Sequence, residues 1–238
     1  HSAVRLEPAR QALAELGGPF TLVDVPYPGF EGRPRVDSYE AFLDDILKFV
    51  KPQLANSLLY ATGISGLFAL SLRARGELMQ TPIILQGPVL WGLAHRWFPW
   101  LMRRGLWRLF PAIIRGRKVQ RRFGQYHLTR PPTPDFLKAF FDGYQACTAK
   151  TDFFHWLTPD LLSRLEHDFA IRPEALQRFS VWWGGRDRIV PLNELRVTEA
   201  ALGVKWPERT FAHWGHYPMI DEPEEWVREL SHALATLA

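Results

Sequence analysis

The sequence lacks the residue patterns that define several familiar classes of protein. Only one of its 238 residues is cysteine, Cys147, so no internal disulfide can form and a reducing, cytoplasmic location is favoured. No uncharged stretch is long enough to predict a membrane-spanning helix. Metal-ligand spacing, a Walker loop and a dinucleotide fingerprint are missing too, so we expect neither a metal nor a cofactor.

Methionine is missing from the start of the sequence, and acidic residues are missing from a long internal stretch. Residue 1 is His1 and the first methionine is Met79, so we expect the sequence to begin downstream of the natural start. No acidic residue lies between Glu77 and Asp135, although the net charge of the chain is only +4. The basic residues of that stretch are Arg96, Arg103, Arg104, Arg108, Arg115, Arg117, Lys118, Arg121, Arg122 and Arg130. This asymmetry predicts one basic surface and says nothing about the fold.

What is present is an alternation of strand and helix patterns in a chain that is 47% hydrophobic. The expected strands are Phe20–Val25, Ser57–Ala61, Pro82–Leu85, Phe179–Trp183 and Glu208–Phe211. The expected helices are Glu7–Leu16, Ser38–Val50, Ile64–Arg75, Asn193–Leu202 and Glu222–Leu237. The alternation predicts an α/β fold with a doubly wound, mostly parallel sheet. Residues 1–87 and 179–238 would form its core, and residues 88–178 an inserted helical cap.

Chemically useful residues follow the expected strands. Ligands of open parallel sheets bind beyond the carboxyl ends of the strands, so these positions are the candidates for a site. Gly184–Pro191 (GGRDRIVP) follows one strand, and Ala212–Pro218 (AHWGHYP) follows the next. Thr62–Gly66 (TGISG) lies between an earlier strand and a helix.

These segments, in this order and spacing, resemble the α/β-hydrolase superfamily over about Glu7–Gly87 and Phe179–Ala238. The resemblance implies that Asp187 orients His216, and that His216 is the general base toward a serine on a tight strand-to-helix turn. The alternatives are a turn-capping role for Asp187 and a surface position for His216. The nearest rival base, His213, is expected to face another way.

The nucleophile of this family has two candidate positions here. The turn requires small residues two positions before and after the nucleophile, and Ala61 and Ser65 satisfy that rule around Gly63. Sterics and strand length favour this alignment, which leaves no attacking oxygen. The other alignment makes Ser65 the nucleophile but puts Leu67 at a position that needs a small residue. In the first alignment the backbone N–H of Ile64 would point at the family's oxyanion position.

The family's first three strands have no counterpart in this sequence, and neither does the loop that carries its second oxyanion donor. The resemblance implies that the third strand would lie between Phe20–Val25 and Ser57–Ala61. Its absence would leave a gap there or force those two segments to pair. We therefore expect either a longer protein or a reduced sheet of about five strands.

The inserted block combines tryptophan and phenylalanine with arginine between Val89 and Phe123. This composition is compatible with an ordinary cap whose arginines are solvated, and also with contact to a membrane surface. Nucleic-acid binding is not expected, because no recognition motif accompanies the charge. The aromatic cap predicts a large hydrophobic substrate. Two functions follow. The first is hydrolysis of a hydrophobic ester, thioester or related substrate by Ser65, Asp187 and His216. The second is a non-hydrolytic protein, with Gly63 at the nucleophile position, that binds a lipophilic ligand or partner.

Overall fold

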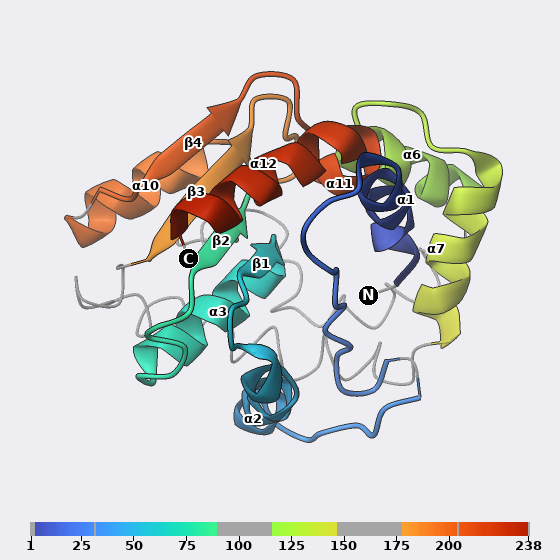
Figure 1. Cartoon of the computed structure of the whole chain (residues 1–238). Coiled ribbons are helices and arrows are strands. Elements are labelled where there is room, and N and C mark those ends of the chain that lie inside the picture. Colours follow the sequence, from blue (N-terminus) through green and yellow to red (C-terminus); the bar gives the residue numbers. More distant parts are fainter. Residues whose placement is uncertain (1–2, 31, 90–115, 147–177, 204, 238) are drawn as a thin grey trace.

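A parallel sheet forms the centre of the computed structural model, which describes residues 3–30, 32–89, 116–146, 178–203 and 205–237 (Figure 1). Within these residues the sheet has the strands β1 (Leu59–Thr62), β2 (Ile83–Gln86), β3 (Phe179–Gly184) and β4 (Glu208–Phe211), in that spatial order. All neighbouring pairs are parallel. Each strand lies within two residues of its expected bounds, which confirms the predicted α/β class.

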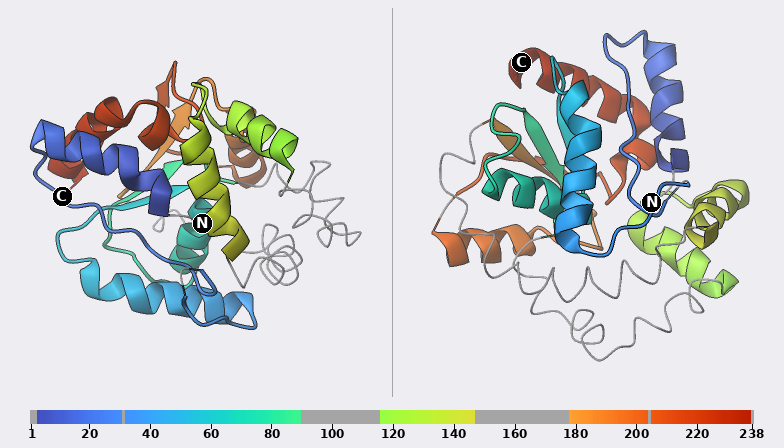
Figure 2. Two further views of the ribbon diagram at one scale, coloured as in Figure 1. Left: turned by 90° about the vertical axis from the view of Figure 1, so that its right-hand side faces the viewer. Right: turned by 90° about the horizontal axis from the view of Figure 1, so that it is seen from below.

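Side chains of successive strand residues enter two separate cores, as the pleat of a strand requires. Ile83 and Leu85 pack on the side of α2 (Tyr39–Val50), α3 (Ile64–Ala74) and α10 (Asn193–Leu202). Ile84 and Trp182 pack on the opposite side, against α1 (Glu7–Leu16) and α12 (Pro223–Leu237). Helices therefore cover both faces of the sheet (Figure 2).

Local capping explains where several helices begin and end. Ser38 precedes α2, and its hydroxyl accepts a hydrogen bond from the N–H of Ala41 at 3.1 Å. Helix α1 ends at Gly17, which has φ +61°, and α10 ends at Gly203, which has φ +65°. The predicted bounds of α1 and α10 are confirmed.

The expected helix Glu222–Leu237 is shorter than predicted and follows a separate turn. A four-residue helix, α11 (Pro218–Asp221), ends before α12 begins at Pro223. Proline has no N–H to continue the hydrogen bonds of α11, and its ring fits the start of a helix. Two short 3₁₀ helices, η1 (Ala3–Leu6) and η2 (Lys51–Gln53), precede α1 and follow α2.

The predicted strand Phe20–Val25 is wrong. The segment has no strand assignment, and no backbone hydrogen bond between it and β1 exists in the described part of the chain. Its β-rich composition expresses a local preference, but a strand needs a neighbour, and β1 is not within pairing reach. The described sheet consequently has four strands rather than about five.

The described part of the predicted insertion is helical. It contains α6 (Arg117–His127) and α7 (Pro134–Ala146), which lie beside η1 and α11 (Figure 1). Residues 90–115 and 147–177, which hold all the tryptophans of the predicted cap, lie outside the described residues. Among the helices that are described, none is long and apolar enough to cross a membrane.

Candidate active site

The turn between β1 and α3 centres on Gly63. Its backbone has φ +56° and ψ −120°, a conformation that disfavours any residue with a Cβ. The Gly63 N–H donates to the carbonyl of Gln86 at 3.0 Å, and its own carbonyl accepts from the N–H of Val89 at 3.0 Å. These bonds to the segment around β2 hold the turn in its strained form. Gly66 lets α3 approach closely, because a Cβ there would be 2.7 Å from Pro88 Cβ.

Asp187 and His216 form a buried pair beyond the ends of β3 and β4. The Nδ1 of His216 and the Oδ2 of Asp187 are 2.8 Å apart, and the two side chains are 5% and 0% exposed. Oδ1 of Asp187 accepts the backbone N–H groups of Ile189 and Val190 at 2.8 and 2.9 Å. A carboxylate can only accept, so Nδ1 carries the proton and Nε2 of a neutral ring is left as a base.

The free ring nitrogen of His216 faces Gly63. An ideal Cβ built on Gly63 would lie 3.0 Å from Nε2 and 3.3 Å from Cε1 of His216. A side chain at residue 63 would therefore meet the base directly, which is the relation that a nucleophile requires. Glycine presents no oxygen there, so residue 63 itself supplies no reacting group in front of Nε2.

Ser65, the other nucleophile candidate, hydrogen-bonds elsewhere. It lies in the first turn of α3, and its hydroxyl is 2.5 Å from the hydroxyl of Tyr27. Burial raises the pKa of Tyr27 to about 12, although the hydrogen bond with Ser65 lowers it. The phenol is therefore neutral near pH 7 and cannot act as a base toward Ser65. In the described part of the chain no hydrogen bond joins Ser65 to His216.

His213 lies close to His216 in sequence but belongs to a different surface. Its side chain is exposed, and its Nε2 is 2.6 Å from a carboxylate oxygen of Glu225 on α12. Burial works against ionisation of Glu225, but the hydrogen bond with His213 lowers its pKa. His213 thus takes part in a hydrogen bond with α12, whereas His216 pairs with Asp187.

Gly87 is a further site residue that the sequence analysis missed. A Cβ on Gly87 would lie 2.6 Å from Asp187 Oδ2 and 3.5 Å from His216 Nδ1. Its φ of +45° also favours glycine. The hydrogen-bonded pair therefore packs directly on this backbone. The only sequence signal was a glycine at the end of β2, which alone is weak evidence.

One backbone donor is available beside Gly63. The N–H of Ile64 opens α3 and has no backbone acceptor among the described residues, as expected for the first residue of a helix. Such a group can stabilise negative charge on an oxygen that is bound at the turn. No cluster of His, Cys, Asp or Glu side chains that could hold a metal ion occurs in the described ranges.

The last residue of α6 and the residues that follow it pack against His216 and its neighbours. The ring of His127 lies 5.8 Å from that of His216 and stacks on Tyr217 at 5.5 Å. Asp221, which is buried, accepts the backbone N–H of Thr129 at 2.8 Å. This contact ties the inserted residues to the loop that carries His216.

Comparison with known proteins identifies the family and the fold of the chain. The Alpha/beta hydrolase family matches residues 5–230. None of the curated proteins matches the chain. Among solved structures, a haloalkane dehalogenase loop variant from Bradyrhizobium elkanii has a TM-score of 0.69 at 16% identity, with 99% of this chain and 86% of that chain covered.

Two further structures share the fold. An esterase from Exiguobacterium antarcticum has a TM-score of 0.64 at 15% identity and covers 99% of this chain and 90% of its own. A membrane phospholipase A, described as a bacterial virulence factor, has a TM-score of 0.60 at 20% identity, with coverage of 90% and 69%. At these identities the likeness concerns the fold, whereas the family match spans nearly the whole sequence. The chain therefore belongs to the alpha/beta hydrolase family.

Proposed function

We propose that this chain hydrolyses a hydrophobic ester or thioester with His216 as a general base on water. The observation that carries the proposal is the buried Asp187–His216 pair, whose free Nε2 faces the bare backbone of Gly63. A base held in this way, with no nucleophilic side chain at residue 63, is suited to taking a proton from a water molecule.

The reaction would proceed in two steps. His216 Nε2 takes a proton from water while the water oxygen attacks the carbonyl carbon, and the carbonyl oxygen becomes an oxyanion near the N–H of Ile64. The oxyanion then collapses, the bond to the leaving alkoxide or thiolate breaks, and His216 returns the proton to that leaving group. Asp187 keeps the ring oriented and stabilises its protonated form.

A hydrophobic substrate is supported by the aromatic content of the inserted segment. It is also supported by the fold neighbours, which include an esterase, a lipase and a phospholipase. These neighbours share only the fold, so the substrate class is part of the proposal. Contact of the protein with a membrane surface belongs to the same proposal, because Arg117, Lys118, Arg121 and Arg122 are all exposed on α6.

The test compares wild type with His216→Gln and Ser65→Ala on long-chain and acetyl p-nitrophenyl esters. We expect His216→Gln to lose turnover, Ser65→Ala to keep it, and a fluorophosphonate probe to label neither the wild type nor Ser65→Ala. Labelling of Ser65 and loss of turnover in Ser65→Ala would instead identify Ser65 as the nucleophile. Turnover of acetyl esters alone would contradict a hydrophobic substrate.

The second candidate function is binding without hydrolysis. The same Gly63 supports it, because a covalent mechanism needs a nucleophilic side chain at this position and glycine has none. Wild-type turnover no higher than that of His216→Gln, together with retained binding of a long-chain ester analogue, would favour this function over hydrolysis.

A further inference from the structure

A second histidine, His127 at the end of α6, lies against the base of the candidate site. The centroid of its ring is 5.8 Å from that of His216, and the two planes meet at 75°. The ring of His127 also stacks on Tyr217, with centroids 5.5 Å apart and planes at 14°. Tyr217 in turn contacts His216 edge to face at 4.7 Å. His127 is half-buried, so a molecule that binds next to His216 can still reach part of its ring.

Asp221 holds the chain that follows His127. Its Oδ2 accepts the N–H of Thr129 at 2.8 Å, and its Oδ1 accepts the N–H of Arg130 at 3.4 Å. The side chain is buried, with 2% of the residue exposed, and it belongs to α11, which begins directly after Tyr217. A carboxylate that binds two successive amides with separate oxygens fixes the direction of that chain as well as its distance.

The backbone just before His216 is part of the same contact. A Cβ on Gly215 would lie 3.0 Å from both Asp221 Oδ2 and Thr129 Cγ2. It would also lie 3.4 Å from the carbonyl oxygen of His127. The loop that carries the base and the end of the inserted helix are therefore packed together without a gap.

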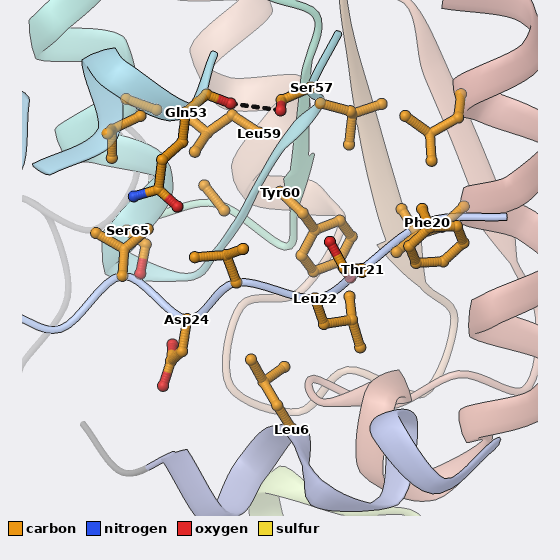
Figure 3. A pocket seen from close by; sticks show the side chains of 18 of the residues that line it. Leu6, Phe20, Thr21, Leu22, Asp24, Gln53, Ser57, Leu59, Tyr60 and Ser65 are labelled. Atoms are coloured by element: carbon orange, nitrogen blue, oxygen red, sulfur yellow. Dashed lines mark hydrogen bonds between the residues drawn. The ribbon is translucent and has the colours of Figure 1, made fainter. Parts of the chain in front are cut away.

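This contact is separate from the largest cavity near the sheet. That cavity measures about 940 Å³ and lies between β1 and residues 20–25, with Ser65 at one end (Figure 3). His127, His216 and Asp221 are not among the residues that line it. The role of Asp221 therefore has to be sought at the base and not in that cavity.

We propose that Asp221 is a positioning residue, which holds His127 beside His216 so that His127 contacts the substrate. The base itself does not need Asp221, because Asp187 orients His216 and is held by the N–H groups after β3. Loss of Asp221 should therefore displace His127 and leave the base paired. The contact of His127 with substrate rests on the proposed function, whereas the control of His127 by Asp221 does not.

NMR of the histidine rings tests the positioning without any substrate. Asp221→Asn keeps the size of the side chain but leaves one oxygen to accept two N–H groups. We expect it to move the ring signals of His127, because the stack on Tyr217 changes, and to retain the Nδ1–H signal of His216. The control is Glu222→Gln, which removes the neighbouring carboxylate that binds the exposed guanidinium of Arg130 at 2.8 Å. It should move neither set of signals.

Steady-state turnover of a long-chain p-nitrophenyl ester tests the contact with substrate. Asp221→Asn and His127→Ala should each raise KM by about tenfold and leave kcat within about twofold, because substrate placement is lost and the base is kept. The double variant should raise KM no further than His127→Ala does, because Asp221 acts through His127.

Two variants control for effects that do not pass through His127. Glu222→Gln should leave KM within about twofold, because exposed ion pairs contribute little. Ser38→Ala removes the cap of α2, so it lowers the Tm with no change at the site and shows what lost stability alone does to KM.

Three results would overturn the proposal. They are unmoved His127 signals in folded Asp221→Asn, additive effects on KM in the double variant, and a rise in KM for Ser38→Ala as large as that for Asp221→Asn. Absence of wild-type turnover would refute the proposed hydrolysis and with it the contact of His127 with substrate. The NMR comparison alone decides whether Asp221 positions His127, so the two failures are distinguishable.

Discussion

Replacing Gly63 with serine should place a hydroxyl in front of the base. The Cβ position of residue 63 lies 3.0 Å from His216 Nε2, so the new Oγ would be within hydrogen-bonding reach after a shift of a few tenths of an ångström in the ring. Because φ is +56°, the substitution should lower the free energy of unfolding by about 1–3 kcal/mol.

Gly63→Ala is the matched control, because it has the same backbone strain and the same Cβ but no hydroxyl. We expect both variants to lose similar stability in urea unfolding. Only Gly63→Ser should react with a fluorophosphonate, and only it should release a burst of p-nitrophenol from a long-chain ester, as an acyl-enzyme forms.

The double variant Gly63→Ser with His216→Gln tests whether the reaction uses the base. It should fold but lose the labelling, because the serine then has no proton acceptor. The reasoning would be refuted if the folded single variant stayed unlabelled, or if peptide mapping found the label on Ser65. Either result would show that residue 63 is not the position that His216 serves.

Two further predictions concern residues around the histidine. Gly87→Ala should destabilise the protein and separate the Asp187–His216 pair, because the new Cβ would lie 2.6 Å from Asp187 Oδ2. Gly76→Ala is the control for backbone strain alone, because Gly76 has φ +81° and nothing within 4 Å of its Cβ position. Equal losses of unfolding free energy and equal shifts of the His216 NMR signals in both variants would argue against a specific contact at Gly87. Burial raises the pKa of Asp221 above 3.8, although the N–H of Thr129 opposes this. A raised folded pKa stabilises the protein below the unfolded pKa and loses that contribution as pH rises through the folded value. The free-energy difference between Asp221→Asn and wild type should therefore shift in favour of wild type as pH falls from about 7 to about 4, and a pH-independent difference in urea unfolding would contradict the assignment.

Local patterns were sufficient for most of the fold. Strand bounds, the capping of α2 by Ser38 and the ends of α1 and α10 depend on neighbours in sequence, so composition and periodicity predicted them. The segment Phe20–Val25 shows the limit of this reasoning. Its residues favour a strand, but a strand forms only when a neighbouring strand pairs with it, and no local pattern reports whether that neighbour is present.

The sequence likewise predicts some features of the candidate site and not others. The resemblance of the segments after two consecutive strands implies the pairing of Asp187 with His216, and the structure brings their side chains together at 2.8 Å. The contacts of Gly87 and Tyr27 were not predictable, because they join segments far apart in sequence. Tyr27 and Ser65, for example, are 38 residues apart, and only the folded chain shows that their hydroxyls meet.

The alignment at the turn could be chosen from the sequence because it depends on local sterics. A strained turn tolerates only small neighbours, and that rule favours Gly63 at the nucleophile position. The structure adds the direction of the missing side chain, which points at His216 Nε2. An intact acid and base thus face a position that has no nucleophile of its own. In the proposed reaction the attacking group therefore comes from water, and the substitution Gly63→Ser can test that dependence.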